Sequence, residues 1–310
     1  MWSPCCAKRG YSGMTETKPD QPRTRRHHLI YVTANDQRNF SIDYLNFRNM
    51  IARHPGVPRV DITIAISRVR PWSKGNEMEM GALVGAAEAA PWLAVRAVIW
   101  KGNVGRDFSS TEACLQSLVG IAEADDFVMV RNRSAYGPFT DDWYSAYVDQ
   151  FEKHPGTGLV GNTINLTGPP TMPAGEDGRH VQTYIYLSRW KHLAPLAASY
   201  PGRRCLDNAS AILDGELGLN RKIMAAGLDI SCLYWPERTF GLATADDPTL
   251  PRKDIKAQVE SLPFRYKFPD YRRNREAMQS RIAWVLGARW PLRRTRGAAV
   301  DMFRHIADYD

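Results

Sequence analysis

Long apolar runs and paired cysteines are both scarce in this chain of 310 residues. The longest apolar stretch, Gly81 to Val95, is interrupted by Glu88 and Pro91 and falls short of the roughly 20 apolar residues that a spanning helix needs. We therefore expect no bilayer crossing. The five cysteines are an odd number and include no CxxC spacing. This pattern argues against a zinc or redox motif and favours structural thiols in a reducing compartment.

A secretory signal is also missing, because the first 28 residues contain no apolar core of the kind that such signals carry. Residues 1–27 hold Gly, Pro, Ser and charges without apolar periodicity, so we expect a flexible leader. The expected location is cytoplasmic, with a peripheral position on the inner face of the cell membrane as one option. With 44% hydrophobic residues, the chain can bury the core of one large domain.

The positive net charge of +8 is concentrated at the two ends. Of the 41 Lys and Arg, 6 lie in residues 1–28 and 11 in residues 265–310, which leaves 24 between them. Of the 33 Asp and Glu, 2 and 5 lie in those segments, which leaves 26. The body is therefore nearly neutral, and we expect no nucleic-acid partner. A basic nucleic-acid-associated protein stays an alternative only if both ends form one face with the body.

Short β-branched or apolar runs alternate with helix-like segments from residue 28 onward, which predicts an α/β fold with a mostly parallel sheet flanked by helices. The expected strands are residues 28–33, 61–67, 95–100, 127–131, 158–165, 181–188 and 229–234.

The sequence indicates where three helices begin and end. One should run from Ser109 or Ser110 to about Ala124, and a second from an N-cap at Thr140 to a stop before Pro155. A third should cover residues 216–226 and end at Gly227 as a left-handed cap. The Gly- and Pro-rich loop at 168–178 has a length that is often functional.

We expect three parts: the leader 1–27, one α/β domain over 28–250, and a basic helical extension over 251–310. From Arg272 to Arg296 the extension interleaves arginines with large apolar residues, which is typical of an amphipathic interfacial segment. One interpretation is docking on an anionic membrane surface, where each cation contributes about 1 kcal/mol. The other is a solvated helical pair packed on the core through Trp284 and Trp290.

Two polar segments follow expected strands, where open α/β sheets bind ligands. In Lys101-Gly-Asn-Val-Gly-Arg-Asp107, the glycines allow close backbone approach, Arg106 could face a phosphate, and Asp107 could accept from a ribose or base. The segment is neither a Walker loop nor GxGxxG, so a tight turn with an exposed ion pair stays open. A second strand delivers Asn132 and Ser134 to its end.

An ordered set of motifs resembles bacterial glycosyltransferases related to the rhamnan synthesis protein F family, over roughly residues 28–240. The motifs are Asn103-x-Gly-Arg-Asp107, Asn132-x-Ser-x-x-Gly-Pro138, Gly158-Leu-Val-Gly161, His180-Val-Gln-Thr183, and Glu216 followed by Gly227. The resemblance implies a GT-A-like, Rossmann-like fold and a nucleotide-activated sugar donor. The implied acceptor is a cell-surface polysaccharide or a lipid-linked glycan.

The resemblance implies that Asn103, Arg106 and Asp107 line the nucleotide and that Asn132 and Ser134 lie near the diphosphate. Thr33 and Arg133 complete the expected donor-binding set. Either Arg131 or Arg133 could neutralise the leaving diphosphate. Residues 132–134 read Asn-Arg-Ser where GT-A enzymes usually carry Asp-x-Asp. Without those carboxylates we expect no tightly held metal; Mg²⁺ or Mn²⁺ would be held weakly, through the donor diphosphate.

On the acceptor side, His180 and Gln182 alternate with Val181 and Thr183 and share one strand face, where they could hydrogen-bond an acceptor sugar. A structural histidine is the alternative. Glu216 is the first candidate for the base that removes the acceptor proton in an inverting transfer, and Asp214 is the second. Acids also complement a helix dipole in its first turn. The missing acidic triplet favours one rival function, a non-catalytic nucleotide-sugar or glycan-binding scaffold of a polysaccharide assembly system.

Overall fold

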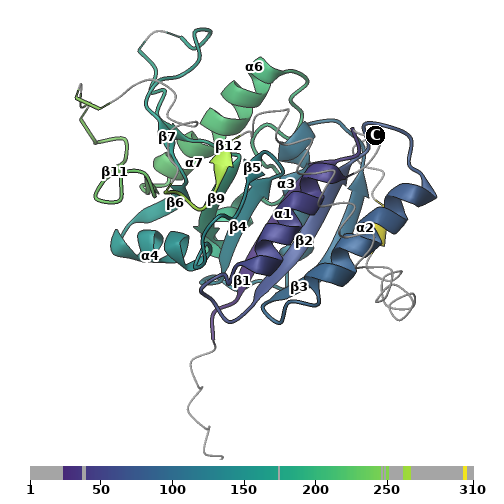
Figure 1. Cartoon of the computed structure of the whole chain (residues 1–310). Helices are drawn as coiled ribbons and strands as arrows, with labels where there is room; N and C mark the ends of the chain where they lie inside the picture. Colours follow the sequence, from purple (N-terminus) through teal and green to yellow (C-terminus); the bar gives the residue numbers. More distant parts are fainter. Residues whose placement is uncertain are drawn as a thin grey trace, which may run out of the picture.

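The structure is a computed structural model that describes residues 24–36, 40–173, 175–245, 247, 249–250, 261–266 and 303–305. These residues form a central nine-stranded sheet with helices on both faces (Figure 1). The strand order is β11-β10-β6-β9-β4-β1-β2-β3-β13. The mostly parallel α/β sheet that the alternation predicts is therefore confirmed.

The strands of the large sheet are β1 (His27–Ala34), β2 (Val60–Ser67), β3 (Leu93–Lys101), β4 (Phe127–Asn132), β6 (Thr157–Gly161), β9 (Ile185–Arg189), β10 (Asp229–Cys232), β11 (Thr239–Phe240) and β13 (Phe303–His305). Two small pairs join β5 (Ala135–Tyr136) to β12 (Arg265–Tyr266) and β7 (Ile164–Asn165) to β8 (His180–Val181). The helices are α1 (Ser41–Ala52), α2 (Lys74–Ala87), α3 (Arg106–Leu118), α4 (Ser145–Lys153), α5 (Trp190–Leu193), α6 (Asn208–Ser210) and α7 (Gly218–Ala225), with a 3-10 turn η1 (Ala194–Leu196) and a π-helix η2 (Ala211–Leu217).

Strand β9 is an antiparallel strand within the mostly parallel sheet. This strand lies between β4 and β6 and is antiparallel to both, whereas β1, β2, β3 and β4 are mutually parallel and β10 is parallel to β6. The expected strands at 158–165 and 181–188 each divide into a long strand of the main sheet and a two-residue strand of the β7–β8 pair. The division turns the chain out of the sheet and returns it as β9.

The sheet is buried on both faces because its strands send alternate side chains to two cores. In β1, Leu29 and Tyr31 pack in one core with residues of α1, α2 and α4, while Ile30 and Val32 pack in the other with residues of α3, α5 and α7. All four side chains are at most 1% exposed. Each burial of this kind contributes about 1.5–3 kcal/mol, so the sheet is a rigid support for whatever its edges carry.

Two predicted helix starts are wrong. Helix α3 begins at Arg106 rather than Ser109 or Ser110, because Gly105 enters the left-handed region at φ 73° and turns the chain into the helix at once. Helix α4 begins at Ser145 rather than after Thr140, because the carboxylate of Asp141 accepts from the His54 amide at 2.9 Å and holds the preceding turn.

The third expected helix begins earlier than predicted and changes type along its length. Residues 211–217 form the π-helix η2, and α7 continues from it to Ala225. The expected left-handed cap is confirmed, because Gly227 has φ 76°. π-Helices are rare in proteins, and many of those that do occur lie at functional sites.

Parts of the expected C-terminal extension belong to the sheet and its core. Phe264 is fully buried in the core that contains α1, α2 and α4, β12 pairs with β5, and β13 adds a parallel strand beside β3. Residues 272–296, like residues 1–23 of the expected leader, lie outside the described residues. No helix in the described part of the chain combines the length and apolar character that crossing a membrane requires.

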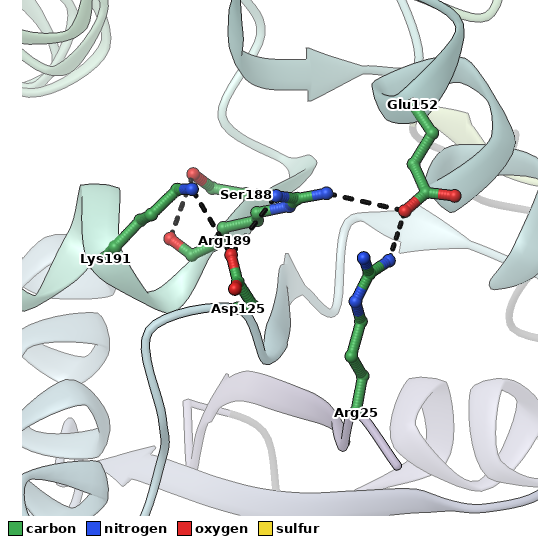
Figure 2. A network of polar contacts seen from close by, with 6 residues as sticks. All are labelled: Arg25, Asp125, Glu152, Ser188, Arg189 and Lys191. Atoms are coloured by element: carbon green, nitrogen blue, oxygen red, sulfur yellow. Dashed lines mark hydrogen bonds and ion pairs between the residues drawn. The ribbon is translucent and has the colours of Figure 1, made fainter. Parts of the chain in front are cut away.

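A chain of ion pairs lies where β4 and β1 begin and β9 ends (Figure 2). Arg189 donates through Nη1 to Asp125 at 3.2 Å and through Nη2 to Glu152 at 3.4 Å, and Lys191 also reaches Asp125 at 3.2 Å. Arg25 pairs with the same Glu152 carboxylate. Since these cations are matched by carboxylates at a solvent-exposed site, each pair contributes at most about 1 kcal/mol.

We expect Gly105→Ala to destabilise the fold more than Gly120→Ala. Both glycines have nearly the same positive φ, 73° and 75°, which costs alanine about 1–2 kcal/mol. A Cβ at Gly105 would also lie 1.9 Å from the carbonyl oxygen of Arg203, whereas a Cβ at Gly120 meets nothing within 4 Å. Urea unfolding of both variants should show an additional loss of about 1–3 kcal/mol for Gly105→Ala, and equal losses would contradict the close approach.

Candidate functional site

A cavity of about 550 Å³ opens at the end of the sheet where β4 finishes. Its walls come from the first turn of α3, the end of β4, the β7–β8 pair, the π-helix η2 and β12. Seven of the residues predicted from the sequence line it, although they are spread over more than a hundred positions: Arg106, Asp107, Asn132, Ser134, His180, Gln182 and Glu216. The loop residues Thr167, Gly168 and Pro169 also contribute, which brings the start of the predicted functional loop to the site.

One side of the cavity lies where β3 and β4 end. Asn132 donates from Nδ2 to the Asp107 carboxylate at 2.7 Å, and its Oδ1 accepts from the Ser134 amide at 2.9 Å. Protein surrounds the Asp107 carboxyl on most sides although part of it stays exposed, and this desolvation raises its pKa above the usual range. The three residues form one polar surface that can accept and donate hydrogen bonds.

Arg106 lies beside this surface and has an unusual backbone conformation. Its φ is 48°, which a non-glycine residue rarely adopts, and its guanidinium donates to the Asn208 side chain while its surface stays exposed. Backbone strain of this kind costs about 1–3 kcal/mol and concentrates at functional sites. Arg106 thus places a cation in the cavity wall, and no carboxylate in the described part of the chain forms an ion pair with it.

Lys101 lies beneath the same turn and is fully buried. Its ammonium donates to the carbonyl oxygens of Gly102 at 2.5 Å and Val104 at 3.4 Å. Burial lowers the Lys101 pKa to about 8, with the Asp107 carboxylate acting in the opposite direction. The lysine therefore fastens the turn from inside and does not line the cavity.

His180 and Glu216 face each other in another part of the cavity wall. His180 is 2% exposed, and its Nδ1 lies 2.7 Å from the carbonyl oxygen of Gly178, which makes Nδ1 the protonated nitrogen. Its Nε2 lies 3.3 Å from the Asn165 amide nitrogen and 3.5 Å from Oε2 of Glu216. The Glu216 side chain keeps 27% exposure, so its carboxylate can reach a molecule in the cavity.

Gln182 brings an unused hydrogen-bond donor to the cavity. The residue is 1% exposed, and its Oε1 accepts from the Thr163 hydroxyl at 2.7 Å. Its Nε2 is buried without a hydrogen-bond partner among the described residues. A buried donor left unpaired costs about 1–3 kcal/mol, and an acceptor atom of a bound molecule would remove that cost.

Asn220 of α7 is a positioning residue that the sequence did not indicate. It is fully buried, accepts from the Val181 amide at 2.9 Å, and donates to the carbonyl oxygens of Val181 at 3.2 Å and Glu216 at 2.8 Å. One side chain therefore ties β8, which carries His180, to the π-helix that carries Glu216. No sequence pattern distinguishes an asparagine inside a helix that makes these contacts from one that does not.

Several predicted residues lie elsewhere. Thr33 is buried in β1, Asn103 is exposed on the turn, and Asp214 is exposed on the π-helix; none of these three lines the cavity. Arg133 pairs through both terminal nitrogens with Asp36, which explains why it does not face the cavity.

Arg131 is likewise engaged away from the cavity. It is fully buried, donates to the Ala135 carbonyl at 2.5 Å and stacks between the rings of Tyr31 and Phe264. Neither this arginine nor its neighbour Arg133 is therefore placed to neutralise a diphosphate, because structural partners on other elements hold both.

The residues at the end of β4 do not fit a protein-held metal ion. Asp107 is the single carboxylate beside Asn132 and Ser134, and the Asn132 oxygen already accepts from a backbone amide. Mg²⁺ and Mn²⁺ prefer several charged or carbonyl oxygens. In the described part of the chain, no group of three or more His, Cys, Asp or Glu could hold a metal ion.

No protein-family model matches the chain, and no curated protein matches it by sequence. Among solved structures, the arrangement is similar to a 4-diphosphocytidyl-2C-methyl-D-erythritol synthase, at 12% identity over 68% of this chain and 88% of the synthase, with a TM-score of 0.39. It is also similar to the mannosyltransferase PcManGT from Pyrobaculum calidifontis in complex with GDP-Man and Mn²⁺, at 12% identity over 68% of this chain and 55% of that protein, with a TM-score of 0.43.

A third similar structure is the galactosyltransferase LgtC in complex with donor and acceptor sugar analogues, at 13% identity over 66% of this chain and 72% of LgtC, with a TM-score of 0.38. The match spans little more than half of the mannosyltransferase. These likenesses concern overall arrangement alone, and the resemblance to the rhamnan synthesis protein F family stays a prediction.

The buried lysine predicts a stability change with pH. The unfolded chain should bind the Lys101 proton up to about pH 10.5, whereas the folded chain releases it near pH 8. Below pH 8 the folded state carries the cost of a buried charge, and stability should rise by about 2 kcal/mol from pH 7 to 9.5 as that charge disappears. Urea unfolding of the parent and Lys101→Met at both pH values should give this rise in the parent relative to the variant. Parallel pH profiles would contradict the assignment.

Proposed function

We propose that the chain is a glycosyltransferase that moves a sugar from a nucleotide-activated donor to a cell-surface polysaccharide or a lipid-linked glycan acceptor. The observation that carries the proposal is the convergence of predicted donor-side and acceptor-side residues on one cavity at the end of a mostly parallel sheet. Open α/β sheets bind ligands at this edge. Cytoplasmic and cell-envelope settings belong to the same proposal and follow from the proposed acceptor.

On the donor side, Asp107 and Asn132 would hold the ribose or base, and Ser134 would lie near the diphosphate. Arg106 takes over the neutralising role first predicted for Arg131 or Arg133, because it is the arginine that lines the cavity. A fixed cation beside the leaving diphosphate stabilises the negative charge that develops there. Any Mg²⁺ or Mn²⁺ would be carried on the diphosphate rather than by a protein cage.

On the acceptor side, a sugar hydroxyl would lie between the Glu216 carboxylate and the unpaired Nε2 of Gln182. The hydroxyl proton passes to Glu216 while the oxygen attacks the anomeric carbon and the bond to the diphosphate breaks. His180 lies beside Glu216, with Nε2 3.5 Å from Oε2, and is held by Gly178 and Asn165. Most of the rate enhancement would then come from positioning and electrostatics.

Arrival of a lipid-linked acceptor would place the protein at the inner face of the membrane. The basic segment 272–296 supports this through its interleaved arginines and apolar residues.

Glu216→Gln should abolish sugar transfer, with a loss of at least about a thousandfold in kcat, while donor binding persists. The matched control is Asp214→Asn, which removes a carboxylate two residues away that is exposed and outside the cavity. The control should keep activity within about twofold. Rates measured by release of nucleoside diphosphate would decide the role, and turnover retained in Glu216→Gln would remove Glu216 as the base.

The donor site is tested by the melting temperature in the presence of nucleoside diphosphate sugars, with and without Mg²⁺ or Mn²⁺, since a ligand that binds the folded state must raise it. One donor family should raise the melting temperature of the parent, and Asp107→Ala should lose most of that shift because Asp107 contacts the nucleotide. An unchanged shift in Asp107→Ala would contradict its role. No shift with any donor would favour the scaffold function.

A further inference from the structure

Four large apolar side chains are exposed at the same end of the sheet as the cavity. They are Val69 (47% exposed), Trp72 (42%), Val104 (37%) and Leu206 (80%). They lie on three loops, 68–74 after β2, 102–105 after β3 and 203–207 before α6, which we call the apolar rim. Scattered apolar side chains need no explanation, but a gathered set beside a site marks an interaction surface.

Backbone contacts join the three loops into one surface. The Arg68 amide donates to the carbonyl of Lys101 at 2.8 Å, which sets the first loop beside the second. The second loop touches the third because a Cβ on Gly105 would lie 1.9 Å from the Arg203 carbonyl oxygen, and the Cys205 thiol lies 3.6 Å from the carbonyl of Gly105. The third loop leads to the cavity, whose wall includes Asn208.

The first loop is also held rigid. The buried Asn35 side chain accepts from the amides of Val69 at 2.8 Å and Arg70 at 3.0 Å and donates to the Arg70 carbonyl at 3.0 Å. The structure therefore fixes the backbone that displays Val69. An ordered loop with an apolar tip can insert into a boundary layer without a further ordering cost.

The apolar rim is basic as well as apolar. Its loops carry Arg68, Arg70, Lys74 and Arg204 against one acid, Asp207, while a further cation, Arg203, is paired with the buried Glu112 at 3.1 Å. Asp207 is already used, because its carboxylate accepts from the Ser210 amide at 2.8 Å as the cap of α6. Cations interspersed with Trp and aliphatic side chains match the interfacial layer of an anionic bilayer, in which Trp is enriched.

We propose that the apolar rim docks the protein on an anionic lipid surface. Docking in this orientation turns the mouth of the cavity toward the bilayer, because Arg106 and Asn208 connect the apolar rim to the cavity wall. The orientation rests on the proposed function, since a lipid-linked acceptor would then enter without leaving the membrane. The docking itself does not rest on the proposed function, because it depends only on side chains outside the cavity.

The test is co-sedimentation of the full chain with vesicles, in the absence of any donor. Vesicles of phosphatidylcholine alone are compared with vesicles that also contain about 30% phosphatidylglycerol. Trp72→Ser with Leu206→Ser removes the two largest apolar side chains of the apolar rim. The matched control, Val119→Ser with Ile121→Ser, removes two that are 62% and 52% exposed near the far end of α3.

The parent should partition at least about tenfold better onto the anionic vesicles, the apolar-rim variant should lose about tenfold, and the control should stay within about twofold. Unchanged melting temperatures show that both variants are folded. Failure of the parent to bind anionic vesicles overturns the proposal, and so does full binding by the apolar-rim variant, which would assign binding to segment 272–296. A donor-induced melting shift that persists in either case shows that the catalytic proposal stands apart from the docking.

Discussion

The close approach of three glycine backbones governs the shape of the candidate site. Gly105 lies against the Arg203 carbonyl, and a Cβ on Gly202 would meet the backbone of Gly215 at 2.6 Å. A Cβ on Gly215 would in turn enter the Phe108 ring at 2.3 Å. Larger side chains would therefore separate α3 from the π-helix. Because Asp107 belongs to one of these elements and Glu216 to the other, the distance between the proposed donor and acceptor sides depends on these contacts.

The distribution of cations follows from the same geometry. Lys101 and Arg131 are fully buried, and both donate hydrogen bonds to backbone carbonyl oxygens. Arg133 is held by Asp36. Buried cations must be paired or hydrogen-bonded, since an isolated charge would be too costly to desolvate. These three cations therefore stabilise turns at the carboxyl end of the sheet, and Arg106 is left as the charge that can face an anionic ligand.

The sequence predicts the sheet well because burial on both faces produces continuous apolar runs that are easy to read. It does not give the direction of β9, because side-chain alternation is the same in parallel and antiparallel strands. The predicted helix starts were wrong where the start depends on contacts with other elements, as with Asp141 and the distant His54 amide. At the site, Asp107 and Asn132 could be predicted since they follow strands, whereas the pairing of Arg133 with Asp36 joins residues 97 positions apart.

On the proposed acceptor side, the structural residue His180 contacts Glu216, which is the proposed base. His180 donates from Nδ1 to a carbonyl and so keeps the Nε2 lone pair toward Asn165 and Glu216. In this tautomer Nε2 accepts from the Asn165 amide and has no proton to donate, so the Glu216 carboxylate receives no hydrogen bond from His180. The buried Nε2 of Gln182 then requires an acceptor atom in the cavity. A sugar hydroxyl satisfies both groups at once, because its oxygen accepts from the glutamine amide while its proton points to the carboxylate.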